Sequence, residues 1–243
     1  MVNLIHGDSF EIIRNMKEKI DAIITDPPYI LHADGGGGIM NNREFAKELV
    51  QNEIHKGFDS REFLDMCLSL FETKQHFCGV FFCSNKQIHE YLDWAIKNNF
   101  QYGVGVWHKT NPVPLCGFKY LNDVEYWIYI KGKKSKILGN YHTKSMVYIS
   151  QVNKADKKLY GHPTIKPLEI IRNFVLNHSS EGQTVFDPFM GTGTTGVVCK
   201  ELNRKFIGIE HQKEHFDTAV IRIDSHEVDK KQESHGYDSV LDI

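Results

Sequence analysis

The sequence has no paired cysteines, no long apolar run and little net charge. Its five cysteines lie scattered through 243 residues without a C-x-x-C pair. This spacing argues against a disulfide framework or a zinc site and predicts reduced thiols, as in cytosolic proteins. No apolar run approaches the length that spans a bilayer, and the amino terminus shows no signal-peptide pattern. We therefore expect a cytoplasmic protein that needs neither a membrane nor a metal ion.

The overall composition is that of a globular chain. Hydrophobic residues make up 41% of it, which is enough for a sizeable core and excludes wholesale disorder. The formal net charge of −2 does not mark the chain as a whole as a nucleic-acid binder. Strand-like and helix-like segments alternate, which predicts an α/β fold with a mostly parallel sheet. We count seven strands, near residues 3, 22, 80, 104, 125, 184 and 206.

The motif D-P-P-Y, Asp26 to Tyr29, follows an apolar run at 22–25 that reads as a short buried strand. The first proline keeps Asp26 extended, and the second fixes the next backbone step, so the Asp26 carboxylate and the Pro27 carbonyl converge on one point. Two acceptors beside the Tyr29 ring suit a planar group with an exocyclic amine, such as a nucleobase. The plainer interpretation is a strand end followed by a proline turn.

A second unit lies near the other end of the chain. A predicted strand at 184–186 leads into D-P-F-M-G-T-G-T-T-G at 187–196, a helix follows, and the strand 206–210 ends at Glu210. Glycines let a backbone approach a ligand closely, and a helix amino terminus offers free N–H groups to a carboxylate. Glu210 can hold both hydroxyls of a ribose. The G-x-G-x-x-G spacing within the loop is also compatible with a dinucleotide site.

Two further stretches are candidate ligand contacts. Asp8 follows a predicted strand at 2–5, where α/β sheets bind ligands, although it equally fits an ordinary helix cap. Lys131 to Lys158 contains eight lysines and one acid, a local balance of 8 − 1 = +7. Such a run is often only a solvated surface, but its one-sided charge favours phosphate contact. The candidate lysines are Lys109, Lys131, Lys133, Lys134, Lys136 and Lys144.

Taken together, the motifs resemble the amino-methylating DNA methyltransferases that use S-adenosylmethionine, in their permuted beta group. In that group D-P-P-Y comes first, the target-recognition region follows and the cofactor motif comes last, which is the order found here. H-G-D-S at 6–9, K-T-N-P-V-P at 109–114, V-E-Y-W-I-Y-I-K-G at 124–132, H-P-T-I-K-P at 162–167 and F-I-G-I-E at 206–210 also match. The resemblance covers nearly the whole chain. The Gly35–Gly38 run has no counterpart in the family, and the recognition region is short.

The resemblance implies one catalytic domain over 1–243, built on a seven-stranded, Rossmann-like methyltransferase sheet with helices on both faces. Cofactor motifs would lie at 3–30 and 161–223, a target-recognition insert at 109–160, and a polar tail at 224–243. The residues that it assigns to S-adenosylmethionine are Asp8, Asp26, Thr164, Lys166, Asp187, Pro188, Phe189, Gly191, Gly193, Thr194 and Glu210. The implied partner is double-stranded DNA, in a prokaryotic or phage-infected cell. A homodimer and a companion restriction enzyme stay open.

The resemblance makes Asp26, Pro27, Pro28 and Tyr29 the catalytic turn of an adenine-N6 methyltransferase. Asp26 and the Pro27 carbonyl would accept the two N–H bonds of a flipped-out adenine, Tyr29 would stack on it, and methyl transfer would be a direct displacement. In the family, serine commonly replaces the first residue of this motif for cytosine, so Asp26 favours adenine over cytosine-N4. Less favoured alternatives are an NAD-dependent oxidoreductase, which leaves D-P-P-Y unused, and a non-catalytic DNA-binding protein, which leaves both loops unused.

Overall fold

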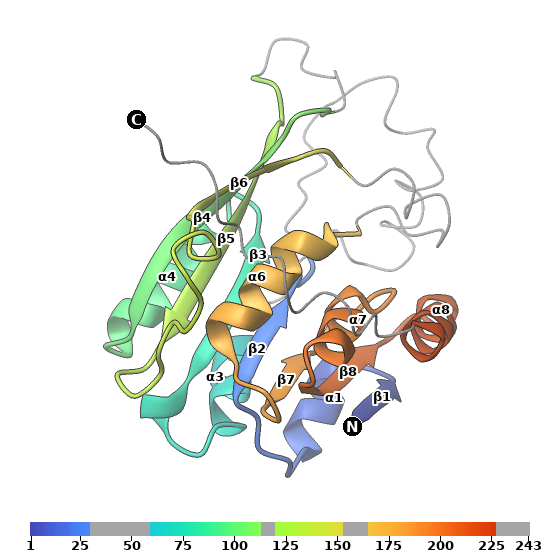
Figure 1. Cartoon of the computed structure of the whole chain (residues 1–243). Coiled ribbons are helices and arrows are strands. Elements are labelled where there is room, and N and C mark those ends of the chain that lie inside the picture. Colours follow the sequence, from blue (N-terminus) through green and yellow to red (C-terminus); the bar gives the residue numbers. More distant parts are fainter. Residues whose placement is uncertain (30–58, 113–119, 153–164, 227–243) are drawn as a thin grey trace.

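The computed structural model of the chain describes residues 1–29, 59–112, 120–152 and 165–226, which form an eight-stranded sheet between two layers of helices (Figure 1). In spatial order the strands run β1-β8-β7-β2-β3-β5-β4-β6. Every neighbouring pair is parallel except the two made by β5. The strands are β1 (Val2–His6), β2 (Ala22–Thr25), β3 (Cys78–Cys83), β4 (Gln101–Lys109), β5 (Val124–Lys131), β6 (Val147–Ser150), β7 (Thr184–Asp187) and β8 (Lys205–Glu210).

The predicted α/β class and the mostly parallel sheet are confirmed, but the strand count is one higher than the seven expected. The additional strand, β6, pairs in parallel with β4 and lies at the edge of the described sheet. It is only four residues long, and Val147 and Ile149 are exposed while Tyr148 is buried. A strand this short, inside a lysine-rich stretch, leaves little hydrophobic pattern to recognise.

In the part of the chain that the structure describes, three helices cover each face of the sheet (Figure 1). One face carries α1 (Ser9–Asn15), α3 (Ser60–Ser69) and α4 (Ile88–Lys97), and the other carries α6 (Leu168–His178), α7 (Thr194–Glu201) and α8 (Lys213–Ser225). A short 3-10 turn, η2 (Lys74–His76), precedes β3. None of the helices described here is long and apolar enough to cross a membrane.

Burial on both faces explains why the central strands are apolar throughout. All four residues of β2 and all six of β3 are buried. Phe81 of β3 packs with Phe63 of α3 and Tyr91 of α4 on one face, and Phe82 packs with Phe174 of α6 on the other. Parallel strands covered on both faces have this continuous hydrophobic character, so the sequence shows no alternation there.

The sheet changes direction of winding between β2 and β7, its two central neighbours. From β2 the chain crosses through α3 to β3 on one side, and from β7 it crosses through α7 to β8 on the other side. The loops after β2 and β7 therefore leave in opposite directions from adjacent strand ends. In open α/β sheets such a point is where ligands bind. D-P-P-Y and the glycine-rich loop both begin there.

Because β5 runs antiparallel to β3, it begins beside the carboxyl ends of the parallel strands and ends beside their amino ends. Tyr126, near its start, pairs with Cys83 at the carboxyl end of β3, whereas Lys131 pairs with Cys78 at the beginning of β3. The chain stays at the second edge after β5, because the Lys134 N–H donates to the Gln75 carbonyl (3.0 Å). The start of β5 thus lies at the carboxyl ends of the parallel strands, the edge that carries the candidate loops. The lysines that follow β5 begin at the opposite edge, beside the amino ends of those strands.

Candidate active site

The D-P-P-Y turn is held in shape by the segment that follows β3. Gln87 is almost completely buried, and its Nε2 donates to the Pro28 carbonyl at 3.1 Å. The Gln87 Oε1 in turn accepts from the backbone N–H and the hydroxyl of Ser84, at 3.2 and 2.8 Å. Pro27 is buried and Asp26 has 24% of its side chain exposed. A fixed turn therefore presents the Asp26 carboxylate at the open edge of the sheet.

Asp187, at the end of β7, joins this turn to the glycine-rich loop. Its Oδ1 accepts from Thr25 Oγ1 at the end of β2 (2.7 Å) and from the Phe189 N–H (3.2 Å), and its Oδ2 accepts from Thr195 Oγ1 of α7 (2.7 Å). Burial raises the pKa of Asp187 to about 7, although these three donors favour the charged form. One carboxyl group thus ties together β2, the loop and the first turn of α7.

The glycine-rich loop has the backbone that its sequence predicts. Gly191 (φ 52°) and Gly193 (φ 80°) are in the left-handed region that favours glycine. The helix α7 begins directly after Gly193 without a side-chain cap, so its first N–H groups have no partner within the helix. Behind the loop, the buried Arg222 donates to the hydroxyl of Thr194 at 3.0 Å. Free amides at a helix amino terminus suit an anionic group such as a carboxylate.

Glu210, at the end of β8, braces the same loop. Its Oε2 accepts from the Gly191 N–H at 3.0 Å and its Oε1 from the Gln212 N–H at 2.7 Å. A carboxylate offers about four lone-pair sites, so both oxygens can accept a further hydrogen bond. Glu210 can therefore fix the loop and still receive two ribose hydroxyls.

The turn after β1 lies beside the end of β8, because the Gly7 N–H donates to the Glu210 carbonyl at 3.0 Å. Asp8 is exposed and caps α1 by accepting from the Glu11 N–H at 2.9 Å. The hydroxyl of Ser9 donates to the Pro188 carbonyl, which joins α1 to the glycine-rich loop. The helix-cap interpretation of Asp8 is therefore confirmed, and its contact with a cofactor stays a prediction.

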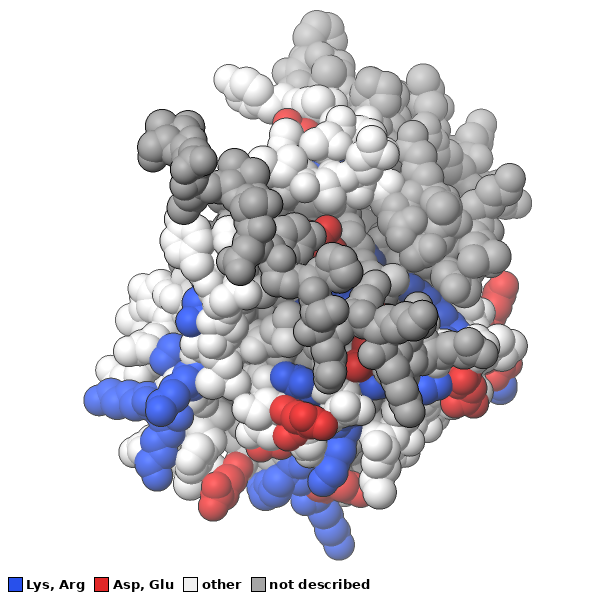
Figure 2. Space-filling model, in the orientation of Figure 1, with Lys and Arg blue, Asp and Glu red and all other residues white. Residues whose placement is uncertain are grey.

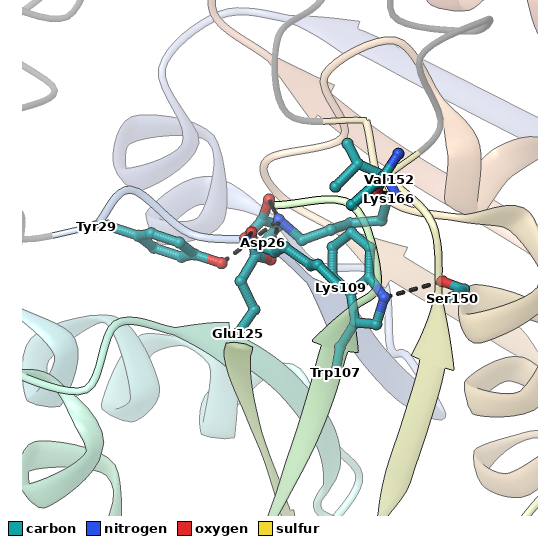
Figure 3. A network of polar contacts seen from close by, with 9 residues as sticks. Asp26, Tyr29, Trp107, Lys109, Glu125, Ser150, Val152 and Lys166 are labelled. Carbon is teal, nitrogen blue, oxygen red and sulfur yellow. Dashed lines mark hydrogen bonds and ion pairs between the residues drawn. The ribbon is translucent and has the colours of Figure 1, made fainter. Parts of the chain in front are cut away.

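The Asp26 carboxylate is the first member of a chain of four charged side chains (Figure 3). Lys166 lies between two acids, with its Nζ 2.5 Å from Asp26 Oδ2 and 3.1 Å from Glu125 Oε2. Lys109, at the end of β4, continues the chain with its Nζ 2.7 Å from Glu125 Oε1. The Tyr29 hydroxyl is 3.4 Å from Lys166 Nζ. The order Asp26–Lys166–Glu125–Lys109 alternates negative and positive charge.

Mutual attraction opposes the effect of burial on these groups. Burial raises the pKa of Asp26, and Lys166 offsets only part of that effect. Burial alone would lower the pKa of Lys166, but the neighbouring charges of Asp26 and Glu125 raise it instead. Burial alone would raise the pKa of Glu125, but Lys166 and Lys109 lower it. Removing one member would leave its neighbour buried without a partner, which is costly.

The structure brings together most, but not all, of the residues predicted for the site. The edge at which β2 and β7 end carries Asp26, Pro27, Pro28, Tyr29, Lys166, Asp187, Pro188, Phe189, Gly191, Gly193 and Thr194, and Glu210 ends the neighbouring strand β8. Lys166 contacts Asp26 and Glu125, and its contact with the cofactor stays a prediction. Thr164 and the Gly35–Gly38 run lie outside the described residues. Of the expected tail, 224–243, the first two residues belong to α8 and 227–243 are outside the described residues.

The predicted phosphate-binding lysines do not share one location. Lys131, Lys133 and Lys134 lie at the edge where β3 begins, opposite the Asp26 edge, because β5 runs antiparallel to β3. Figure 2 shows Lys and Arg side chains along the lower edge of one face, with acidic side chains among them. Lys136 follows in the same segment, and Lys144 is in a turn next to Thr143, whose hydroxyl donates to Asn177 of α6 (2.8 Å). Only Lys109 lies at the Asp26 edge. Phosphate contact by these lysines stays a prediction.

Sequence reasoning did not assign a role to Glu125, Thr25 or Gln87. Glu125 had a detectable signal, since it is a lone acid in the otherwise apolar strand V-E-Y-W-I-Y-I. Thr25 carries no such signal, because threonine is common in strands. Gln87 acts through a contact with Pro28 that only the tertiary structure creates.

Comparison with known proteins agrees with this geometry. The sequence model of a family described as DNA methylase, of the N6/N4 methyltransferase type, matches residues 20–221. The chain belongs to this DNA methylase family. The type II methyltransferase M2.DpnII of Streptococcus pneumoniae is 29% identical to the methylase. The match covers 91% of this chain and 89% of M2.DpnII. M.HinfI of Haemophilus influenzae is 31% identical, and the match covers 90% of this chain and 67% of M.HinfI.

A solved structure extends the likeness to the cofactor. The crystal structure of the M1.HpyAVI–SAM complex is 30% identical to the methylase, with a TM-score of 0.70, and the match covers 92% of this chain and 99% of that one. The methylase is thus an S-adenosylmethionine-dependent DNA methyltransferase with the Rossmann-like α/β fold that its sequence predicted.

Proposed function

We propose that the methylase transfers a methyl group from S-adenosylmethionine to the N6 amino group of a specific, flipped-out adenine in double-stranded DNA. The observation that carries this proposal is the state of the Asp26 carboxylate. Its Oδ2 is held by Lys166, whereas its Oδ1 is buried and has no hydrogen-bond partner among the described residues. A buried acceptor without a donor costs about 1–3 kcal/mol, which a substrate N–H would recover.

The residues next to Asp26 fit the cofactor. The uncapped N–H groups at the start of α7 suit the carboxylate of its methionine part, and the left-handed backbone at Gly191 and Gly193 brings the loop close to a ligand. The spare lone pairs of Glu210 suit the two ribose hydroxyls. We also assign Pro188, Phe189 and Thr194 to the cofactor, and Asp8 to its adenine.

The chain's own contribution is positioning and electrostatics. When bound, S-adenosylmethionine supplies an electrophilic methyl group, whose bond to sulfur breaks and leaves its electron pair on sulfur as the amino nitrogen lone pair forms the new bond. Asp26 Oδ1 and the Pro27 carbonyl accept the two N–H bonds and aim that lone pair. Asp26 also stabilises the positive charge that develops on nitrogen, and takes the proton that the methylated nitrogen releases. Tyr29 stacks on the flipped base.

The choice between adenine and cytosine rests on Asp26. The family acts on both amino groups, and serine at this position is common for cytosine, so an aspartate supports adenine. Cytosine-N4 methylation is the alternative, since it would use the same two acceptors and the same direct displacement.

Target recognition is proposed for the connection between β4 and β5, within the insert expected at 109–160. This connection leaves the sheet at the edge that carries Asp26, because β4 ends there with Lys109 and β5 begins there with Glu125. The insert expected at 109–160 also contains β5 and β6, which belong to the sheet. A cytoplasmic location, a homodimer and independence of metal ions also stay proposals.

The test is the identity of the methylated base. Purified methylase is incubated with tritiated S-adenosylmethionine and unmethylated bacterial DNA, and the digested nucleosides are separated by mass spectrometry. We expect N6-methyl-2′-deoxyadenosine. The appearance of N4-methylcytosine would refute only the choice of base, and the absence of any labelled nucleoside would refute the proposed reaction.

A further inference from the structure

The two oxygens of Asp26 have different surroundings, and a residue outside the catalytic turn maintains the difference. Lys166 contacts only Oδ2, at 2.5 Å, and Oδ1 is left free. An ammonium group beside a single carboxylate is free to approach both of its oxygens. Here Glu125 contacts the same ammonium from the opposite side, at 3.1 Å. Lys166 is thus held between two acids (Figure 3), and its ammonium contacts Asp26 Oδ2 while Oδ1 has no hydrogen-bond partner among the described residues.

Glu125 is itself fixed from a third strand. Lys109 of β4 contacts its second oxygen at 2.7 Å, and Lys109 also lies over the Trp107 ring, 5.4 Å from its centroid. Both partners are largely buried, with 12% of the Lys109 and 20% of the Glu125 side chain exposed. Little water is therefore available to replace either contact. The position of the Lys166 ammonium depends on the β4–β5 pair as well as on Asp26.

The net charge of the four side chains around Asp26 Oδ1 also affects the reaction. Asp26 and Glu125 carry two negative charges, and Lys166 and Lys109 carry two positive charges, so the group as a whole is neutral. Methyl transfer moves positive charge onto the substrate nitrogen beside Asp26. Without the Glu125 carboxylate the group would carry one excess positive charge next to that nitrogen, and repulsion in a buried site would oppose the transfer.

We propose that Glu125 is a positioning residue for methyl transfer: it holds the Lys166 ammonium away from Asp26 Oδ1 and balances the charge beside the target amino group. The inference rests on the proposed function, because it takes Asp26 as the acceptor for that amino group. Glu125 acts through Lys166 and does not touch the substrate. Lys109 supports Glu125 in this role.

The proposal predicts a specific pH signature, because Asp26 accepts its substrate N–H, and later the proton, in its ionised form. The rate therefore rises with pH through the pKa of Asp26. The negative charge of Glu125 raises that pKa, and Lys166 lowers it. Replacing Glu125 by glutamine should move the acid limb of the rate profile to lower pH. Replacing Lys109 by methionine leaves the Glu125 charge less compensated and should move the limb to higher pH.

Other groups near Asp26 do not give this pattern. Burial raises the pKa of Cys83 on β3 to about 12, and raises that of Tyr29 well above its ordinary value, so both titrate above the acid limb. Asp187, after β7, has a pKa raised by burial to about 7. It is present unchanged in wild type and both variants, and its effect on the profile is common to all three.

The experiment measures kcat against pH at saturating DNA and S-adenosylmethionine for wild type, Glu125→Gln and Lys109→Met. We expect the plateau of Glu125→Gln to fall by about 10–100-fold, the range seen when outer-shell partners of functional groups are removed. Its acid limb should move down in pH while that of Lys109→Met moves up. Glu125→Asp, which keeps the charge, should recover part of the plateau.

The matched control is Glu62→Gln, the same chemical change at an exposed acid of α3 that pairs with Arg14. It should leave both plateau and limb as in wild type. A Glu125→Gln plateau or limb that matches wild type, or a lower plateau with an unmoved limb, would overturn the proposal. If Glu125→Gln does not fold, an unmoved limb in Lys109→Met overturns it equally. A wild-type protein that leaves DNA unmethylated would instead refute the proposed function.

Discussion

Thr25 Oγ1, at the end of β2, donates a 2.7 Å hydrogen bond to Asp187 Oδ1, at the end of β7. The two residues end the strands from which the two loops of the proposed reaction leave, one for the base and one for the cofactor. Both are buried, and the strands that carry them are direct neighbours. The distance between amino-group acceptor and methyl donor is therefore set by the sheet and by this contact, not by a mobile connection.

Asp187 should give the methylase an unusual dependence of stability on pH. Burial raises its pKa from 3.8 to about 7, so in this interval the folded state binds a proton more tightly than the unfolded state. Its contribution is fully present below pH 3.8 and is lost as the pH rises to about 7, at up to about 1.4 kcal/mol per pH unit. Asp187→Asn removes this titration.

Urea denaturation of wild type and Asp187→Asn at several pH values between about pH 4 and about pH 8 measures the effect. The free energy of unfolding of wild type, relative to the variant, should decrease with pH across this range. A difference that stays constant with pH would show that Asp187 is ionised throughout, and that its three donors outweigh its burial.

Asp26→Ala should nearly abolish methyl transfer and leave cofactor binding largely intact. The variant removes the acceptor Oδ1, whereas the glycine-rich loop and Glu210 stay in place. Loss of one positioned polar group typically lowers kcat by about 10²–10³-fold. Tritium transfer measures the rate, and calorimetry with S-adenosylhomocysteine measures cofactor affinity. Near wild-type turnover would mean that D-P-P-Y is not the catalytic turn.

Tyr29 should act through its ring and not through its hydroxyl. Stacking on a base is worth about 1–3 kcal/mol, so Tyr29→Ala should weaken capture of the flipped base accordingly. Tyr29→Phe keeps the ring and loses a hydroxyl that lies 3.4 Å from Lys166 Nζ and interacts with Asp26, so it should affect capture of the base less than Tyr29→Ala. Burial holds the pKa of Tyr29 well above its usual value, so Tyr29→Phe should not move the alkaline limb of activity. Fluorescence of a 2-aminopurine target base reports flipping, and equal losses in both variants would argue against stacking.

Glu210→Ala should weaken S-adenosylmethionine binding by about 1.5–3 kcal/mol, the range for hydrogen bonds to charged groups. It should also loosen the loop, because Gly191 and Gln212 lose the acceptor of their N–H groups. Glu210→Gln keeps one oxygen and should lose less. Calorimetry measures the affinity, with Glu181→Ala as control, an exposed acid at the other end of β7. An affinity equal to wild type in Glu210→Ala would exclude the ribose contact.

The sequence predicts the parts of the site that depend on local backbone chemistry. D-P-P-Y and the glycine-rich loop each follow a short apolar strand, and both strands are found where the sequence put them. Prolines and glycines restrict or free the backbone within a few residues, so their effect can be read locally. The α/β class follows equally from the alternation of elements.

Contacts between distant elements could not be predicted in this way. The lysines after β5 looked like part of a DNA-binding surface, but their edge of the sheet depends on β5 running antiparallel, which the charge pattern does not encode. Glu125 reaches Lys166 for the same reason, since the start of β5 meets the end of β3. The strand β6 is too short to show a period.

The strand order also sets the sequence in which the protein can form during synthesis. Among the described strands, β2, β3, β4 and β5 follow one another along the chain and pair together, whereas β7 pairs with β2 across a long separation, and β1 pairs only with β8, Val2 with Phe206. Pairing over such separations closes large loops and is slow. The strands beside the proposed base site can therefore pair before β7 and β8, which carry the proposed cofactor site, have been made. On this order of synthesis, a nascent chain on the ribosome cannot modify DNA until β8 has emerged.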